Sequence, residues 1–351
     1  MKNFTKLALV SSIAISANAM AMQAMDDASL GATTGQDGIN IGIGISKITI
    51  DKLYVHDNDG LSSSAKNTVN GTKLVIDTST TPPTPGFAAN ALVSETPIVG
   101  GTGNAGAIVV KGLTITANTD ALLASHNLAD LQIDSDGGSG TGNSAFINIA
   151  AQVSGLNIQI GEVGVTASNA VPTTTATSIR RGGKDDAGAG QNYNKILSGL
   201  TIKTGQLSAN IQVGAAPQGA MVKLNTVMKG GLEITNLGIL DNSTKQGNGD
   251  GTTGNRAAGE IFVGSIKVAD ANSNDLTIKQ DISVIGKEGA DNGYIRMISS
   301  SGPIDNYVKT IKLGSQSAGS IGDIEVQGLQ TYWSPSIGVY NQGSVITIAG
   351  R

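Results

Sequence analysis

The sequence predicts an all-β protein, an elongated β-solenoid or β-prism-like stack with irregular loop insertions. Three observations indicate this class. The 351-residue chain contains 48 glycines, 3% aromatic and 14% charged residues, and such a composition disfavours helices because an interior glycine costs a helix about 1 kcal/mol. Apolar residues alternate with others, as in INIGIGI at residues 39–45, which is the period of a strand. Finally, a Gly-Leu-polar-Ile unit recurs along the chain.

The N-terminal segment has the three parts of a secretory signal peptide. Two lysines accompany an apolar run at residues 7–15, and Ala-Asn-Ala at 17–19 fits a cleavage site. We therefore expect a signal peptide over residues 1–19, with cleavage after Ala21 as the alternative. The protein is then exported, transiently periplasmic, and finally extracellular or on the outer cell surface. No later apolar run reaches about 18 residues, so no transmembrane segment is expected in the mature chain.

The charge balance argues against a nucleic-acid partner. The chain has 23 basic and 27 acidic residues, whereas phosphate binding needs clustered Lys and Arg. The one basic cluster, Arg180, Arg181 and Lys184, is followed at once by Asp185 and Asp186, and we predict that it is a solvated loop. The chain has no cysteine, so stability must come from burial and backbone pairing instead of disulfides.

The repeated unit organises the body of the chain. It begins at Gly112, Gly155, Gly199 and Gly231, with a looser copy at Gly264, and the successive spacings are 43, 44, 32 and 33 residues. Each unit is too small to enclose a core, so neighbouring units must stack to bury a continuous apolar column. Because no linker separates two differently composed halves, we expect a single elongated β domain over residues 20–351.

Low-complexity tracts interrupt this pattern. They are rich in Gly, Ser, Thr, Asn and Pro and lie near residues 78–86, 136–143, 172–190 and 242–257. Such tracts have few apolar side chains to bury, which predicts exposed loops. Residues 120–126 are compatible with a short helix capped by Asp120, an alternative that the sequence leaves open.

One glycine motif resembles a dinucleotide-binding fingerprint. Residues 101–106 match G-x-G-x-x-G, but the fingerprint needs a helix directly afterwards to hold pyrophosphate. Residues 107–110, Ala-Ile-Val-Val, continue instead as a strand. We therefore predict no cofactor.

A second motif resembles a calcium loop. Asp270, Asn272, Asn274 and Asp281 reproduce the spacing of its oxygen ligands, but Asp275 occupies the sixth position, where glycine is required. The flanking sequences are typical of strands, so a hairpin turn is the expected structure and no metal site is assigned.

Catalytic signals are weak. The chain has two histidines, His56 and His126, and no thiol, so we predict a non-enzymatic protein without catalytic residues. The alternative is a secreted β-helix enzyme acting on polysaccharide, with a carboxylate pair that only the fold assembles. The aromatic cluster around Trp333, which includes Tyr332 and Tyr340, is expected to cap the stacked core, with a binding patch as the alternative.

Both ends of the chain resemble one family. Residues 22–38, MQAMDDASLGATTGQDG, and residues 324–329, IEVQGL, are similar to the FilA-type pilus-system proteins of Gram-negative bacteria. The resemblance implies a component of a pilus- or fimbria-like or adhesive system at the cell surface. Its implied partners are pilus assembly or other cell-surface proteins, with self-association as the alternative. The family label rests on association with pilus assembly, so no functional residues are carried over.

Overall fold

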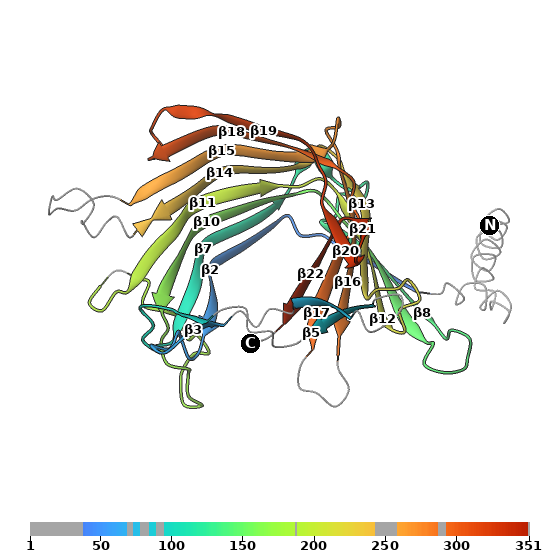
Figure 1. Ribbon diagram of the computed structural model, residues 1–351, viewed down its shortest axis with the longest axis horizontal. Coiled ribbons are helices and arrows are strands. Elements are labelled where there is room, and N and C mark those ends of the chain that lie inside the picture. The colour runs from blue at the N-terminus through green and yellow to red at the C-terminus, as the bar shows by residue number, and fades with distance from the viewer. Residues whose placement is uncertain are drawn as a thin grey trace, which may run out of the picture.

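The computed structural model describes residues 38–68, 73–77, 84–88, 95–186, 188–242, 258–286 and 293–349. It is all-β, as predicted, and consists mainly of two eight-stranded antiparallel sheets, which we call arm A and arm B. The two arms meet along a bend and open away from each other (Figure 1). The signal peptide prediction lies outside the described residues and stays a prediction.

Each arm is a sheet of antiparallel strands, and many neighbours in it are not consecutive in the sequence. Arm A contains, in spatial order, β1 (Ile39–Ile43), β8 (Ala129–Asp136), β9 (Phe146–Val153), β12 (Leu207–Gly214), β13 (Val222–Met228), β16 (Leu276–Ile285), β17 (Tyr294–Ser299) and β22 (Ser344–Ala349). Arm B contains β19 (Ser320–Leu329), β18 (Ile304–Gly314), β15 (Gly259–Asp270), β14 (Leu232–Asp241), β11 (Tyr193–Lys203), β10 (Leu156–Ala167), β7 (Gly106–Ala117) and β2 (Lys47–Asp57).

The chain crosses from one arm to the other at the bend. β9 leads into β10 through Ser154 and Gly155, and β13 leads into β14 through residues 229–231. Hairpin connections at the outer ends then return the chain, so the architecture is one antiparallel meander folded along a line. Each arm keeps two edge strands. The solenoid or prism-like stack predicted from the sequence is not confirmed, because the strands pair antiparallel within two sheets.

Three small sheets accompany the arms. β3 (Lys66–Thr68) pairs with β6 (Glu95–Pro97), β4 (Lys73–Asp77) with β5 (Thr84–Ala88), and β20 (Tyr332–Ser336) with β21 (Val339–Gln342).

The predicted loops have different outcomes. Residues 137–143 and 172–190 connect strands, as expected, whereas the last part of the predicted 78–86 loop belongs to β5. Residues 243–257 lie outside the described part of the chain. The helix considered at 120–126 is limited to a 3-10 turn, Thr119–Ala121, and its cap is Asn118 because the Asn118 side chain accepts a hydrogen bond from the amide of Asp120.

The recurring units lie side by side in arm B. Their isoleucines pair directly across successive strands, because the antiparallel registers place them opposite one another. The resulting isoleucine row crosses the whole arm: Ile48, Ile115, Ile158, Ile202, Ile234, Ile266, Val308 and Ile324. The repeat therefore encodes a cross-strand apolar ladder, a main source of sheet stability.

Arm A carries an equivalent ladder. Its registers align one apolar residue from every strand, forming the arm A row: Ile39, Ile133, Ile149, Ile211, Val222, Ile282, Met297 and Ile346. Side chains alternate between the two faces of a strand. Both arms thus carry an apolar row on one face, half-buried in the interior strands and exposed at Ile39, Ile324 and Ile346 on edge strands, while the residues next in sequence point to the other face.

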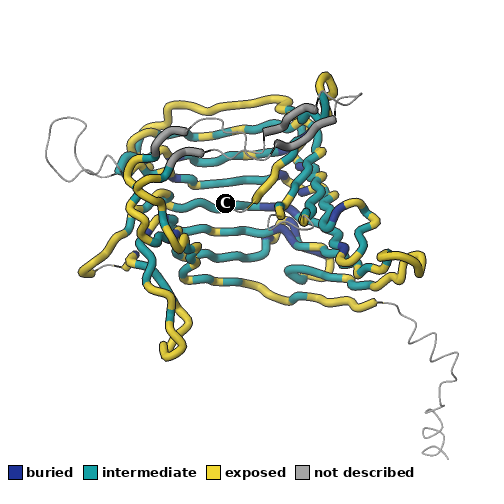
Figure 2. The backbone as a smooth tube through the Cα atoms, turned by 60° about the horizontal axis from the view of Figure 1, so that its bottom comes forward, coloured by how far each residue is buried: buried dark blue, intermediate teal, exposed yellow. Residues whose placement is uncertain are grey.

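Full burial is confined to a few places. Asn118, Ser154, Thr204 and Met228 are buried at or beside the bend, and Val109 is buried at the outer end of arm B, where residues 168–192 connect β10 to β11. Figure 2 shows dark blue segments gathered in such places, with most of both arms intermediate or exposed. The arms therefore do not enclose one thick core between them.

Candidate functional site

A polar row crosses arm B directly beside the isoleucine row. The same registers place eight mainly polar side chains in line on the opposite face: Lys47, Thr116, Asn157, Lys203, Glu233, Lys267, Tyr307 and Glu325. In its middle, Lys203, Glu233 and Lys267 alternate in charge, and opposite charges facing each other across strands are stabilising.

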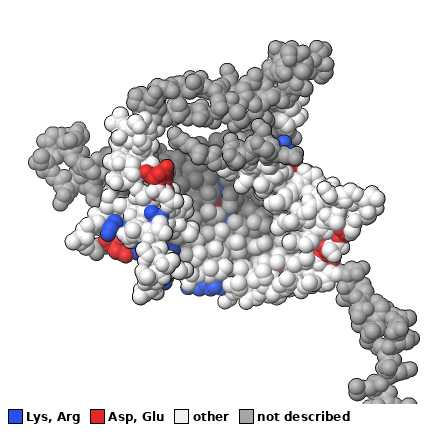
Figure 3. Space-filling view, turned by 90° about the horizontal axis from the view of Figure 1, so that it is seen from below, with Lys and Arg blue, Asp and Glu red and all other residues white. Residues whose placement is uncertain are grey.

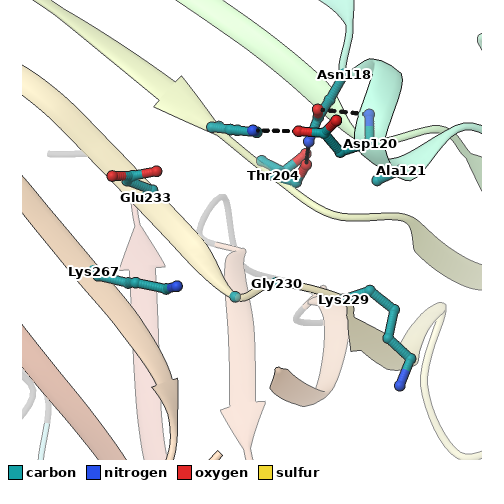
Figure 4. Close-up of a pocket in the computed structure, with 10 residues that line it drawn as sticks. Asn118, Asp120, Ala121, Thr204, Lys229, Gly230, Glu233 and Lys267 are labelled. Atoms are coloured by element: carbon teal, nitrogen blue, oxygen red, sulfur yellow. Dashed lines mark hydrogen bonds and ion pairs between the residues drawn. The ribbon is translucent and has the colours of Figure 1, made fainter. Parts of the chain in front are cut away.

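A pocket of about 260 Å³ lies where this row meets the bend. Lys203, Glu233 and Lys267 come from neighbouring strands of arm B, Asp120 comes from the 3-10 turn, and Lys229 comes from the β13–β14 connection. In Figure 4, the Glu233 and Lys267 side chains lie next to each other on neighbouring strands, below the Asp120 carboxylate. The bend thus gathers five charged side chains that are far apart in the sequence.

Most of these charges already have partners. Lys203 Nζ lies 2.8 Å from Asp120 Oδ2, and Lys229 Nζ lies 2.7 Å from Asp275 Oδ2. The hydrogen bond from Lys203 lowers the pKa of Asp120 and, reciprocally, raises the pKa of Lys203. Glu233 accepts a hydrogen bond from Ser265 at 3.2 Å. The pocket can hold a small polar group.

A second, smaller pocket of about 130 Å³ adjoins the first and shares Lys267. Its lining adds Tyr307 and Glu325 from the polar row and Asp305 from β18. Backbone amides of Asn272 and Gly328 donate to Asp305 and lower its pKa. The two pockets form a polar depression along the bend side of arm B.

The position of three of these residues follows from the repeat in the sequence. Lys203 and Lys267 directly follow a repeat isoleucine, and Glu233 directly precedes one. Because adjacent strand residues point to opposite faces, polar residues next to an apolar ladder must form a ladder of their own. The contribution of Asp120 and Lys229 depends on the bend and has no such local pattern.

The outer end of arm B contains a second charged cluster, and it corrects one prediction. Asp185, expected in a solvated loop, has a completely buried side chain. Lys52 Nζ lies 3.0 Å from Asp185 Oδ2, and Tyr54 donates a 2.6 Å hydrogen bond to Oδ1. Lys111 Nζ donates to the Asp185 carbonyl at 3.1 Å. The expectation was wrong because β2 and β7 supply cations that the local sequence does not show.

Burial alone acts to raise the pKa of the Asp185 carboxyl, but the hydrogen bonds from Tyr54 and Lys52 outweigh it and hold that pKa below its ordinary value. Asp186 also pairs with Lys52, and its hydrogen bond is the largest cause of the raised pKa of Lys52. The ionised Asp185 carboxylate and its partners therefore hold the β10–β11 loop against arm B.

Glu162 extends this cluster across the sheet. It lies 2.5 Å from Lys195 Nζ and accepts a 2.5 Å hydrogen bond from Tyr193. Burial acts to raise the pKa of Glu162, but these two partners lower it overall. Lys111 Nζ lies 3.8 Å from the centroid of the Tyr193 ring, within the range of a cation–π contact. The partners of both carboxylates are supplied from within the protein, which indicates a structural clasp.

The calcium-like motif forms a turn, but not the predicted hairpin, because β15 belongs to arm B and β16 to arm A, so this segment crosses the bend. Asp270 ends β15 and accepts hydrogen bonds from the Thr277 amide and hydroxyl at 2.9 and 2.6 Å. Asn272 adopts a positive φ of 58° in the connection to β16. Asp281 lies within β16 and faces Lys223 at 3.5 Å. The described residues contain no group of three or more His, Cys, Asp and Glu side chains placed to hold a metal ion.

The glycine motif also has the predicted continuation. Gly106 begins β7, so residues 107–110 form a strand.

The two histidines are apart from each other. His56 lies 2.8 Å from Ser168 Oγ and stacks on Tyr54, whereas His126 lies in the connection between β7 and β8, where it has a positive φ of 60°.

Trp333 is half-buried in the β20–β21 hairpin, and Tyr332 and Tyr340 of the same hairpin are 62% and 73% exposed. The hairpin contacts β22 at the edge of arm A. This position beside an edge strand is compatible with both the cap and the binding patch considered from the sequence.

The face seen from below is hollowed at its centre (Figure 3). Most of its visible described surface is uncharged, and the charged side chains gather toward its two sides. None of the helical segments in the described part of the chain is long and apolar enough to cross a membrane.

Comparison with known proteins gives one match. Residues 1–94 match the model of a family described as a family of unknown function (DUF6160), and this match covers the N-terminal segment, β1 of arm A and β2 of arm B. No curated protein and no solved structure matches the chain significantly. Its first 94 residues are therefore similar to a family without an assigned activity, and a function must be argued from geometry.

Proposed function

We propose that the chain is an exported, non-enzymatic structural protein of the bacterial cell surface, a component of a pilus- or fimbria-like or adhesive system. The observation that carries this proposal is the extent of apolar side chains left exposed on two thin arms. Ile39 is 62% exposed, Ile346 49% and Ile324 51%, and all three are members of the cross-strand rows. Exposed apolar surface of this extent is typical of proteins that bind other proteins.

The electrostatics favour a structural role over hydrolysis of polysaccharide. A glycosidase needs one carboxylic acid with a raised pKa to protonate the leaving group. Among the described Asp and Glu residues with a shifted pKa, each shift is downward. These carboxylates instead pair with lysines or accept hydrogen bonds from polar side chains and backbone amides, which suits a structural protein.

In this proposal, several copies or partners together form the elongated structure that we expected from the sequence. One chain supplies only two open arms, so the elongated structure requires contacts between molecules at the cell surface. Pilus assembly proteins or other surface proteins are the proposed partners. The polar depression at the bend is a further place where such a partner can make hydrogen bonds.

Immunogold electron microscopy on intact cells tests the proposal, with a strain lacking the chain as the control. We expect label along surface filaments or at the outer surface, and loss of those filaments or of adhesion in the deletion strain. Label restricted to the periplasm or the medium, with filaments and adhesion unchanged, would contradict it. Assays of polysaccharide cleavage by the purified protein then address the enzymatic alternative.

A further inference from the structure

The two arms end at four edge strands, one of which, β22, is contacted by the β20–β21 hairpin. Within the described residues, β2 and β19 end arm B and β1 and β22 end arm A, and each has one partner strand in its arm. All ten residues of β19 are exposed, including Ile321 at 65%. An edge strand presents unpaired N–H and C=O groups, which form a template for another strand. Figure 1 shows β19 and β2 at opposite ends of arm B.

Strand direction makes these opposite edges compatible. Each arm has eight strands, and neighbours in it are antiparallel, so its two edge strands run in opposite directions. An identical copy placed beyond β19 in the same orientation therefore presents β2 antiparallel to β19. The same holds for β22 and the β1 strand of that copy. Both sheets can be extended by the same neighbouring copy, because β1 and β2 are consecutive strands that form the edges of arm A and arm B at one end of the molecule.

The side chains of β19 and β2 also match in this head-to-tail arrangement. Placing Ile324 opposite Ile48 of the next copy continues the isoleucine row without interruption. That register puts Glu325 opposite Lys47, because both residues are the adjacent members of the polar row. Opposite charges facing each other across antiparallel strands are favourable. In arm A, Ile346 then lies opposite Ile39 and continues the arm A row.

We propose that the chain binds a second copy of itself head to tail, β19 adding to β2 and β22 adding to β1 of the next molecule. A head-to-tail contact is heterologous, and repeating it without closure generates a filament. The part of β19 that makes the contact pairs regularly with β18, from Asn306↔Val326 to Val308↔Ile324. This inference rests on the structural function proposed above and identifies the partner as a second copy of the same chain.

Introduced cysteines test the contact directly, because the chain has none of its own. Lys47→Cys and Glu325→Cys are made in separate full-length mature proteins, which are then mixed and treated with a short bis-maleimide. We expect crosslinked dimers in the mixture at a level at least tenfold above either variant alone. Lys279→Cys is the matched control: it replaces an exposed lysine in the middle of arm A, and with Glu325→Cys it should give only background dimer.

Absence of the mixed dimer, at concentrations where circular dichroism shows folded β protein, would overturn the proposal. A chain carrying both cysteines that crosslinks only within itself would also overturn it, because the two edges would then meet in one molecule. This measurement uses purified protein and is independent of localisation. A positive crosslink with label absent from the cell surface contradicts the proposed function but keeps the self-association.

Discussion

At the scale of single residues, Asp185 is the clearest test of the clasp at the outer end of arm B. Its side chain is fully buried while Lys52 is 30% exposed. Replacing Asp185 with Asn leaves Lys52 and Lys111 beside a neutral amide, and we expect a loss of about 2 kcal/mol in the free energy of unfolding. Asp186→Asn is the control, because that side chain is 78% exposed. Urea denaturation measures both, and equal effects would contradict a buried clasp.

The same carboxylate predicts a pH dependence. Because the pKa of Asp185 is lower in the folded protein than its ordinary value near 4, its stabilisation is present above that ordinary value. It is lost as the pH falls through the lowered folded pKa. We expect cleavage in the 168–192 loop by an acid-active protease to increase below about pH 4. In Asp185→Asn, the same loop should be cleaved equally across this range, and a parallel pH response in the variant would reject the assignment.

Gly155 is predicted to be required at the bend. A Cβ atom there would lie 2.6 Å from both the Ala121 Cβ and the Thr204 carbonyl oxygen, and Thr204 is itself buried. Overpacking of this kind typically costs about 1–3 kcal/mol, so Gly155→Ala should lower the unfolding free energy by that amount. Gly137→Ala is the control, because nothing lies within 4 Å of its added Cβ. A thermal unfolding midpoint that is unchanged in Gly155→Ala would show that the bend is not closely packed.

At the scale of elements, the isoleucine row should contribute more stability than the other face of the same strand. Ile202 pairs with Ile158 and Ile234 on its two neighbours, and it is half-buried. We expect Ile202→Ala to cost about 1–2 kcal/mol, below the range for a fully buried isoleucine. Thr201→Ala, on the opposite face of β11, should change stability by less than about 0.5 kcal/mol. Chemical denaturation of both variants gives the comparison, and a reversed order would place the supporting contacts on the polar face.

The element scale also shows what the sequence could predict. The repeat and the alternation predicted strands, because strand geometry depends on side-chain period alone. The stacked apolar column that we expected from the repeat is not confirmed, and the repeat isoleucines instead pair across the strands of arm B. The path of the chain was not predictable, since connections of unequal length conceal that the units at Gly112, Gly155 and Gly199 belong to neighbouring strands of one sheet. Lys203, Glu233 and Lys267 were predictable from their place beside the repeat. Asp185 was not, because its partners Lys52 and Lys111 are distant in the sequence.

At the scale of the whole molecule, the unusual feature is the long edge strands of the sheets. Natural sheet proteins usually shorten, twist or cover an edge strand to prevent association. Here β19 and β2 contain ten and eleven residues, and the two rows end at them with Ile324 and Glu325 on one side and Ile48 and Lys47 on the other. Edges that are long and complementary in both apolar register and charge are suited to self-association.

Charge reversal tests whether that complementarity operates. Glu325→Lys places a lysine opposite Lys47 of the next copy, and Lys47→Glu places a glutamate opposite Glu325. Because like charges facing each other across strands are destabilising, each variant alone should form at least fivefold less sedimentable filament than the unmodified chain. A chain with both changes regains opposite charges across the contact and should recover assembly, whereas Lys279→Glu in the middle of arm A should assemble normally. Added salt should reduce the defect of the single variants, since exposed charges are screened within about 10 Å at 0.1 M salt. A double variant that assembles no better than the single ones would place any contact between copies at another register or another surface.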